Sequence, residues 1–370
     1  MLPYFGQIFG NPSSVHTFGQ EAEAVLEEAR ETTAQALNCH PDEVVFTSCG
    51  SESDNLALRG IALARLRHSS PPGHLLISPV EHHAVSRTAL QLAKLHGFEV
   101  EYLPADEFGM VHPEEVAARL RPDTILVSVI YANNEIGTVN PIAEIGAICR
   151  AQGVFFHTDA VQAAAYLPVD VQALNVDLLA IGAHKFYGPK GVGALYIRKG
   201  TRLEPILTGG GQEFSLRAGT HNIPYIVGLS EALHLAQAER TERHAHLRPL
   251  RDRMIGRIME EIPQARLTGH PSLRLPNHAS FVFQNVDGNS LLMLLDMEGF
   301  ACSSGSACKT GDPEPSEVLT ALGLERAWAL GSLRVTLGIQ TTPAEIEAFL
   351  DLLPAVVERI RRLADQREVQ

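Results

Sequence analysis

Short apolar runs rich in β-branched residues recur along the first two thirds of the chain and alternate with segments of helical periodicity. The runs cover residues 43–48, 74–78, 98–103, 124–131, 154–159, 177–182 and 193–198. Amphipathic segments such as SDNLALRGIALARL and PIAEIGAICRAQ follow the first and the fourth of them. Strand-length runs that alternate with helices predict a mainly parallel, seven-stranded sheet covered by helices, in an α/β fold.

The pattern changes after about residue 225. A long helical stretch rich in Leu, Ala, Glu and Arg leads to the apolar run HASFVFQNV, a helix around NSLLMLLDMEGF and a final amphipathic helix, AEIEAFLDLLPAVVERIRRLADQ. We therefore predict a large domain over residues 1–232 and a smaller α+β domain over residues 233–370.

Composition narrows the class of protein. The 370 residues are 45% hydrophobic and carry a net charge of −13, with Lys and Arg dispersed along the chain. This balance argues against nucleic acid or an anionic membrane as the main partner. No apolar run approaches the roughly 20 residues that span a bilayer, and the amino terminus lacks the pattern of a signal peptide. We expect a cytoplasmic enzyme.

The five cysteines indicate reactivity rather than cross-linking. Their number is odd and they form no CxxC pair, which argues against a disulfide framework or a zinc site. Cys308 lies in the Ser/Gly-rich stretch ACSSGSACKTGDPEP, a setting typical of an exposed, reactive thiol. An inert loop cysteine is the alternative.

Polar residues follow several predicted strands, where ligands of parallel sheets collect. Asp159 closes VFFHTD, Gln162 follows it, and Lys185 comes after DLLAIG, preceded by His184 and followed by FYGPKG. Singly, such an acid is often a helix cap and such a lysine a surface residue. Together they suit pyridoxal 5'-phosphate (PLP), which needs an amine for its aldehyde and a carboxylate for its pyridine nitrogen.

The segment TSCGSESDNLAL is a candidate phosphate site. A strand ends at Ser48, and Ser51 with Asp54 resembles a capping box that opens a helix. Backbone amides of Gly50, Ser51 and Glu52 then face a dianion, aided by the helix dipole. An ordinary strand-to-helix turn has the same appearance.

Two further strand ends carry polar pairs. SPVEHHAV places His82 and His83 where an imidazole can stack on a pyridine ring and also move protons near neutral pH, which makes His82 a candidate catalytic residue. Adjacent histidines are, however, more often surface or capping residues. YANNEIG places Asn133 and Asn134 where an amide can hold a ring hydroxyl.

These segments together resemble the cysteine desulfurase family, PLP-dependent enzymes of the class V aminotransferase fold (fold type I). The resemblance runs over nearly the whole chain, from FGNPSSVHTFGQEAE to SLRVTLG. Its most specific motifs are VEHHAV, NNEIG, HTDAVQ, AHKFYGPKG, GGGQE with LRAGT, and SSGSAC. It implies a large PLP-binding domain and a smaller C-terminal domain that carries the cysteine.

The resemblance implies cofactor binding by nine residues. These are Gly50, Ser51, His82, Asn134, Asp159, Gln162, His184, Lys185 and Thr220. In this assignment Lys185 bonds to the cofactor aldehyde, Asp159 binds the pyridine nitrogen, and His82 stacks on the ring. Gln162 and Asn134 lie at the ring oxygen, and the rest hold the phosphate.

The resemblance also implies the reaction. Arg334, with Asn134 nearby, binds the carboxylate of L-cysteine, Lys185 moves the α-proton, and Cys308 takes the sulfur as a persulfide while L-alanine leaves. The sulfur then passes to an acceptor protein, an iron-sulfur scaffold being one candidate, or into a thiolation pathway. Thr220 reaches the phosphate of a second subunit, which implies a homodimer.

The chain departs from the family pattern at several points. It begins inside the usual first segment, so we expect a truncated start, and Gly182 replaces a serine that faces the phosphate. This chain has QEFSLR where the family usually has QERGLR, and its LGIQTT lacks the basic residue that often follows LG in the family. Two alternatives therefore stay open: another PLP enzyme acting on a small amino acid, by transamination or selenocysteine cleavage, and a weakly active or inactive paralogue that acts by binding.

Overall fold

The computed structural model describes residues 1–67, 70–305 and 314–368 of the chain. The chain divides into two compact units, each described here by itself. Unit 1 comprises residues 1–104, 111–131 and 140–240, and unit 2 comprises 105–110, 132–139 and the chain from 241 onward. The expected boundary between residues 232 and 233 falls within helix α7 (Ile223–Ala238). A domain boundary at that point stays a prediction.

Seven strands form the sheet of unit 1, in the order β1-β7-β6-β5-β4-β2-β3. They are β1 (Val44–Thr47), β2 (His74–Ile77), β3 (Glu99–Tyr102), β4 (Thr124–Ser128), β5 (Phe155–Asp159), β6 (Leu178–Gly182) and β7 (Gly193–Ile197). β7 pairs antiparallel with β1 and β6, whereas the other pairs are parallel. The predicted mainly parallel sheet of seven strands is confirmed.

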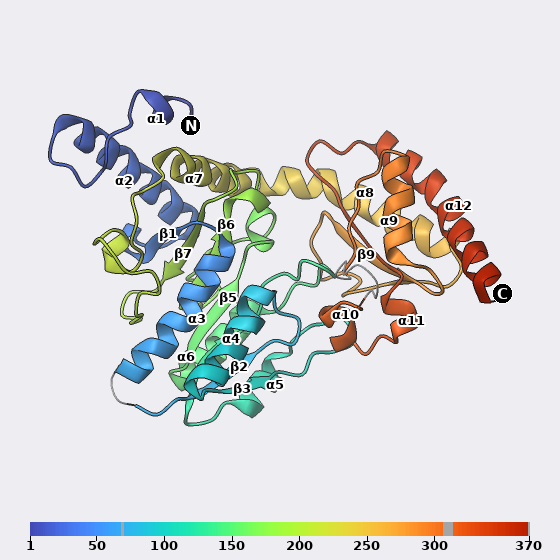
Figure 1. The fold of residues 1–370 in the computed structure, drawn as a ribbon, viewed down its shortest axis with the longest axis horizontal. Coiled ribbons are helices and arrows are strands. Elements are labelled where there is room, and N and C mark those ends of the chain that lie inside the picture. The colour runs from blue at the N-terminus through green and yellow to red at the C-terminus, as the bar shows by residue number, and fades with distance from the viewer. Residues whose placement is uncertain (68–69, 306–313, 369–370) are drawn as a thin grey trace. The chain divides into compact units, whose positions relative to one another are not determined.

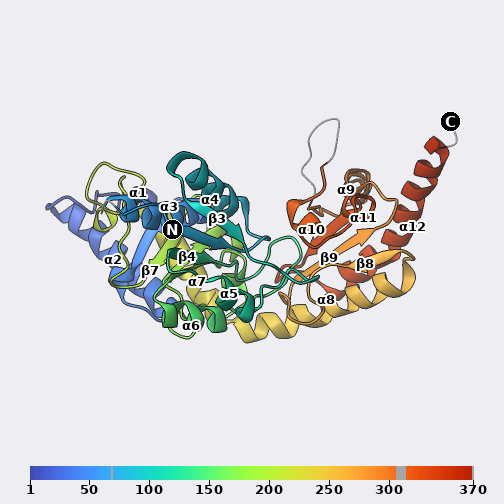
Figure 2. The same cartoon turned by 90° about the horizontal axis from the view of Figure 1, so that it is seen from below.

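Helices cover both faces of this sheet, as parallel strands joined by helical crossovers require. The helices of unit 1 are α1 (Pro3–Gly6), α2 (Thr17–Leu37), α3 (Gly50–Arg67), α4 (His83–His96), α5 (Pro113–Arg119), α6 (Ile142–Gln152) and α7, with the 3-10 turns η1 (Pro41–Glu43), η2 (Ala163–Ala165), η3 (Ala183–Lys185) and η4 (Glu213–Ser215). Figure 2 shows α3 and α4 on one side of the strands and α6 and α7 on the other.

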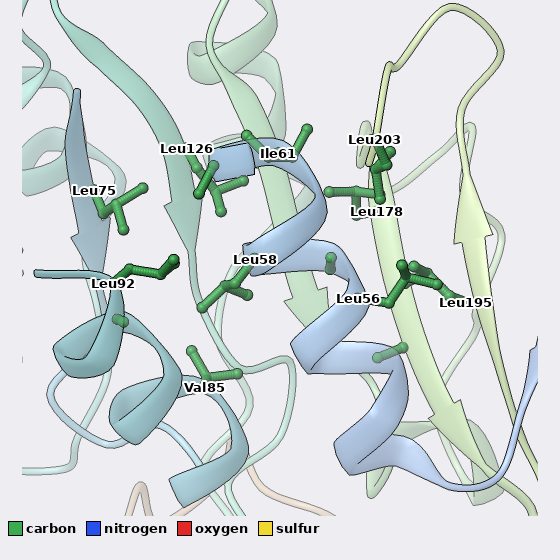
Figure 3. Packing of buried hydrophobic residues seen from close by; sticks show 14 of the residues in the cluster. Leu56, Leu58, Ile61, Leu75, Val85, Leu92, Leu126, Leu178, Leu195 and Leu203 are labelled. Atoms are coloured by element: carbon green, nitrogen blue, oxygen red, sulfur yellow. The ribbon is translucent and has the colours of Figure 1, made fainter. Parts of the chain in front are cut away.

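A continuous apolar layer fixes α3 on the sheet. Leu56, Leu58 and Ile61 of α3 belong to one buried cluster with leucines of the strands, among them Leu126 and Leu178, and Figure 3 shows Leu58 turned toward helix α4. Full burial of one such side chain stabilises the fold by about 1.5–3 kcal/mol. Packing along the whole helix therefore holds its first turn, which begins at Gly50, at the carboxyl end of β1.

Unit 2 is built on a three-stranded antiparallel sheet of order β10-β9-β8. Its elements are α8 (Arg240–Glu261), β8 (Ala265–Leu267), β9 (His278–Phe283), α9 (Gly288–Met297), α10 (Glu317–Ala321), α11 (Arg326–Ala329), β10 (Ser332–Thr336) and α12 (Pro343–Glu368). Figure 1 shows α9 beside α12, and Figure 2 shows α8 below β8 and β9 in that view. The expected α+β composition of the C-terminal part is confirmed.

In the part of the chain that the structure describes, every helix is too short or too polar to cross a membrane.

Candidate active site

The carboxyl ends of most strands of unit 1 meet at one edge of the sheet. β1 and β6 both run antiparallel to β7, so they point the same way as β5, β4 and β2. Asp159 is the last residue of β5, and Lys185 closes the 3-10 turn that follows β6. His82 caps α4 after β2, its Nδ1 accepting from the amide of Ala84 at 3.1 Å. The structure thus brings these predicted site residues to one edge.

Asp159 is the buried acid of this edge. Its side chain is enclosed, the residue being 4% exposed, and its Oδ1 accepts from the amide of Val161 at 2.8 Å. Burial, aided by the nearby Asp54, raises the pKa of Asp159 to about 8, although the Lys185 ammonium lowers it. A cationic ring nitrogen placed against this carboxyl is the partner that would keep it ionised.

His82 and Lys185 lie near Asp159 on the solvent-exposed side of the sheet edge. One side-chain ligand atom each of Asp54, His82 and Asp159 lies within 4.8 Å of the others. Burial lowers the pKa of His82, as do the nearby His83 and Lys185 cations. An uncharged imidazole offers its face to a planar ring, and the exposed Lys185 amine offers a nucleophile beside it.

A buried polar cluster behind Asp159 escaped the sequence analysis. The carboxyl of Asp54 lies 3.4 Å from Nε2 of His157, whose Nδ1 lies 2.9 Å from the hydroxyl of Ser128. Burial raises the pKa of Asp54 and Glu81 well above the usual range, and it lowers the pKa of His157 to about 4. The only signal in the sequence was the position of these polar residues inside or directly after buried strands and in the first turns of α3.

The capping box expected from Ser51 and Asp54 is wrong. α3 begins at Gly50, so Ser51 lies inside the helix instead of capping it, and the carboxylate of Glu52 accepts from the amide of Ser48 at 2.6 Å. Asp54 is buried against His157 because it faces the sheet. The predicted helix start is nevertheless present, so the free amides of the first turn lie at the sheet edge.

Gly182 borders this helix start. A Cβ atom on Gly182 would lie 3.2 Å from the amide nitrogen of Gly50. The absence of a side chain leaves space beside that amide, next to the exposed Ser51 and His184. Together with the buried acid and the exposed amine, this space suits a group with a phosphate at one end and a ring nitrogen at the other. The residues therefore fit the cofactor that the sequence indicated.

The remaining predicted residues of unit 1 are at its surface or partly buried. Gln162 is half-buried and stands immediately before η2, and Thr220 is exposed between η4 and α7. Their expected contacts with the ring oxygen and with the phosphate of a second subunit stay predictions.

Arg334 and Asn134 belong to unit 2 and contact each other. Nη1 of Arg334, on β10, donates to the backbone carbonyl of Asn134 at 2.8 Å, and Nε2 of His278 lies 3.2 Å from the same oxygen. Burial lowers the pKa of Arg334, whereas the nearby Glu135 carboxylate raises it. Asn133 is used structurally, because its Oδ1 accepts from the amides of Glu135 and Ile136 at 2.8 and 2.9 Å.

Cys308 lies outside the described residues. The chain on either side of its segment is anchored: the amide of Ser303 donates to the carbonyl of Arg334 at 3.2 Å, and the hydroxyl of Ser316 donates to the carboxylate of Glu135. Cys302 is half-buried, and burial raises the pKa of its thiol to about 11. Cys302 is therefore protonated at neutral pH and a poor nucleophile.

Comparison with known proteins identifies the family. The family described as Aminotransferase class-V matches residues 1–349. Cysteine desulfurase IscS of Methanosarcina thermophila is 47% identical over 364 residues, which cover 98% of this chain and 89% of the relative. The chain belongs to the cysteine desulfurases of this family. Cysteine desulfurase IscS of Dictyoglomus turgidum is 46% identical over 368 residues, covering 100% of this chain and 92% of that protein.

Solved structures agree with this assignment to the cysteine desulfurases. A NifS-like protein superposes with a TM-score of 0.89 at 35% identity, over 96% of this chain and 94% of its own. SspA in complex with cysteine superposes with a TM-score of 0.77 at 35% identity, over 90% of this chain and 92% of its own. The fold-type prediction is confirmed, and the chain is an enzyme of this family.

Proposed function

We propose that this enzyme is a PLP-dependent cysteine desulfurase that converts L-cysteine to L-alanine and passes the sulfur to Cys308. The observation that carries the proposal is the buried Asp159 with His82 within 4.8 Å and the Lys185 ammonium close enough to lower the pKa of both. A buried acid, a neutral imidazole and an exposed amine are the groups that PLP requires. The IscS relatives support desulfuration rather than another PLP reaction.

The residues at the sheet edge divide the binding task among them. Asp159 would bind the pyridine nitrogen, His82 would cover the ring, and the Lys185 amine would hold the cofactor by its aldehyde. Gln162 and Asn134 would hold the ring oxygen, and Gly50, Ser51 and His184 would hold the phosphate together with Thr220 of a second copy. When bound, PLP supplies an electron-poor ring that stabilises negative charge at the substrate α-carbon.

The chain's own groups carry out the remaining steps. Arg334 binds the substrate carboxylate through its guanidinium, which is held by the carbonyl of Asn134 at 2.8 Å. The Lys185 amine takes the α-proton and later returns a proton to the product. The Asp54–His157 pair and Glu81 keep the surroundings of Asp159 free of further negative charge, because burial favours their uncharged forms.

Sulfur transfer takes place at Cys308. Its thiolate attacks the sulfur of the substrate, an S–S bond forms, the C–S bond breaks, and the carbon is protonated to give L-alanine. The products are one persulfide on Cys308 and one alanine, with no net oxidation. A thiol reductant or an acceptor protein, such as an iron-sulfur scaffold, then removes the outer sulfur.

We also propose that the enzyme is a cytoplasmic homodimer. Large apolar side chains near the amino terminus are exposed in a single copy: Leu2 is 85% exposed, Phe9 65%, Val15 92% and Phe18 57%. Phe9 and Phe18 stack on each other, and exposed apolar side chains that gather in this way are typical of a protein interface. Thr220 is exposed as well, as a contact with a second copy requires.

The test is product release from L-cysteine by the PLP-loaded protein in excess thiol reductant. We expect equal amounts of sulfide and alanine from the wild type, loss of both in Cys308→Ser, and retention of both in Cys302→Ser. Cys302 is the matched control because its thiol lies six residues away and is protonated at neutral pH. Alanine formation that survives in Cys308→Ser would favour another PLP reaction, and dependence on a keto acid would identify transamination.

A further inference from the structure

Glu213 is the centre of a buried cluster of charged side chains. It is distant in the sequence from the site residues at the edge of the sheet. Its two carboxylate oxygens accept hydrogen bonds from the two terminal nitrogens of Arg30, at 2.8 and 3.0 Å. The same carboxylate accepts from the amide of Phe46 at 2.7 Å and lies 2.7 Å from Nε2 of His221. Glu213 and Arg30 are 5% and 3% exposed. Such a bidentate, fully enclosed pair fixes geometry, because either charge left alone in the interior is strongly unfavourable.

The backbone around Glu213 is strained. Glu213, Phe214 and Ser215 have φ values of 45°, 56° and 65°, in the left-handed region that residues with a Cβ atom rarely adopt. Three such residues in succession persist only where surrounding bonds over-determine them. The Arg30 guanidinium provides those bonds, and it also lies 5.2 Å from the centre of the Phe214 ring.

The bond between Glu213 and His221 closes the intervening residues into a loop. Two residues of this loop are tied to residues outside it: the amide of Gly219 donates to Oε1 of Gln212 at 3.1 Å, and Arg217 pairs with Glu52 at 2.9 Å. Thr220 is adjacent to the closing residue and remains exposed. The cluster thus determines where Thr220 is presented.

We propose that the Arg30–Glu213–His221 cluster is a positioning device that holds Thr220 where it binds the cofactor phosphate of a second copy of this chain. The inference rests on the proposed function. It assigns Glu213 a role in trans, although Glu213 itself touches neither substrate nor cofactor. The strained turn sets the direction in which the chain runs toward Thr220. The buried ion pair keeps the turn from relaxing to an ordinary backbone conformation.

The first test compares dissociation of PLP from purified dimers, followed by its absorbance after dilution into phosphate buffer. We expect Glu213→Gln and His221→Asn to release PLP at least tenfold faster than the wild type while remaining dimeric in sedimentation. Glu204→Gln is the matched control, because Glu204 pairs with Arg67 at the opposite end of α3. Wild-type release by Glu213→Gln overturns the inference alone, whereas a wild type that binds no PLP overturns the proposed function.

Mixed dimers distinguish a role in trans from general damage. The first mixed dimer pairs one Lys185→Ala chain with one Glu213→Gln chain. Its only intact Lys185 belongs to the Glu213→Gln chain, and the loop that reaches this site comes from the other chain, which still has Glu213. PLP bonded to this lysine should therefore be released at the wild-type rate. In a dimer of a wild-type chain and a chain with both substitutions, the intact Lys185 faces the altered loop, and release should be at least tenfold faster. The reverse pattern would mean that Glu213 acts within its own subunit, which overturns the inference.

Discussion

The carboxyl of Asp54 lies 3.4 Å from Nε2 of His157, and both side chains are buried. Asp159 is close to this pair, and burial raises its pKa to about 8 whereas burial lowers that of His157 to about 4. Both groups are therefore uncharged over much of the neutral range when no cofactor is bound. The stability of the cofactor-free protein should depend on pH accordingly.

The two groups act in opposite directions. His157, whose folded pKa is lowered, contributes stability that is present above its ordinary pKa of 6.5 and is lost as the pH falls toward 4. Asp159, whose folded pKa is raised, contributes stability that is full below 3.8 and is lost as the pH rises through about 8. Between pH 6.5 and 8 only the second effect remains, so the Asp159 contribution should fall by roughly 2 kcal/mol at most.

The measurement is urea unfolding of cofactor-free protein at pH 6.5 and pH 8. We expect the wild type to lose more stability over this interval than Asp159→Asn, which has no group to ionise at that position. Equal losses in the two proteins would show that Asp159 does not hold its proton in this range.

Ser215 has a φ of 65°, a conformation that glycine adopts without strain. We predict that Ser215→Gly raises the free energy of unfolding by about 0.5–1 kcal/mol, net of the extra entropy of glycine in the unfolded chain. The control is Ala147→Gly on the exposed face of α6, where glycine should cost about 1 kcal/mol. Denaturation midpoints that fall in both variants would contradict the assigned strain.

Gly182 leaves the amide of Gly50 open, since a Cβ there would lie 3.2 Å from that nitrogen. A serine adds a donor to a dianionic phosphate, and a hydrogen bond to a charged group is worth about 1.5–3 kcal/mol before crowding is subtracted. We predict that Gly182→Ser slows PLP dissociation by about tenfold. Gly182→Ala, which adds the crowding without the hydroxyl, should speed it, and slower release in both variants would refute the hydrogen-bond explanation.

The sequence predicts the position of a candidate site residue where that residue directly follows a recognisable strand. Asp159 and Lys185 could be placed because each directly follows an apolar run of strand length, and the ends of parallel strands share one edge. The capping box predicted from Ser51 and Asp54 is wrong because local spacing does not show which face of a helix meets the sheet. Arg30 and Glu213 are separated by 183 positions, so the local sequence around either residue does not predict that they pair.

Short elements were also missed for physical reasons. β8 is three residues long and gives no periodic signal. The segment 132–139 contains NNEIG and follows a strand of unit 1, yet it groups with unit 2. Some of its contacts are hydrogen bonds between backbone groups, such as that from the amide of Val139 to the carbonyl of Leu273. Such bonds leave no trace in the pattern of side chains.

Gly305 and Ser316 hold together the two ends of the stretch that contains Cys308. A Cβ on Gly305 would lie 2.6 Å from Oε2 of Glu135 and 3.1 Å from Cβ of Ser316. Cys308 follows Gly305 by three positions in the chain. Any side chain at position 305 must displace Glu135 or Ser316, and we expect sulfur transfer by Cys308 to depend on this anchor.

We predict that Gly305→Ala lowers the rate of sulfide release by at least tenfold while PLP absorbance and its dissociation rate stay at wild-type values. The cofactor signals should persist because Lys185 and Asp159 belong to unit 1, whereas Gly305, Glu135 and Ser316 belong to unit 2. Gly256→Ala in α8 is the control, because a Cβ there meets nothing within 4 Å. Single-turnover formation of the Cys308 persulfide locates the defect: persulfide that forms at the wild-type rate in Gly305→Ala would mean that the anchor does not set the reach of Cys308.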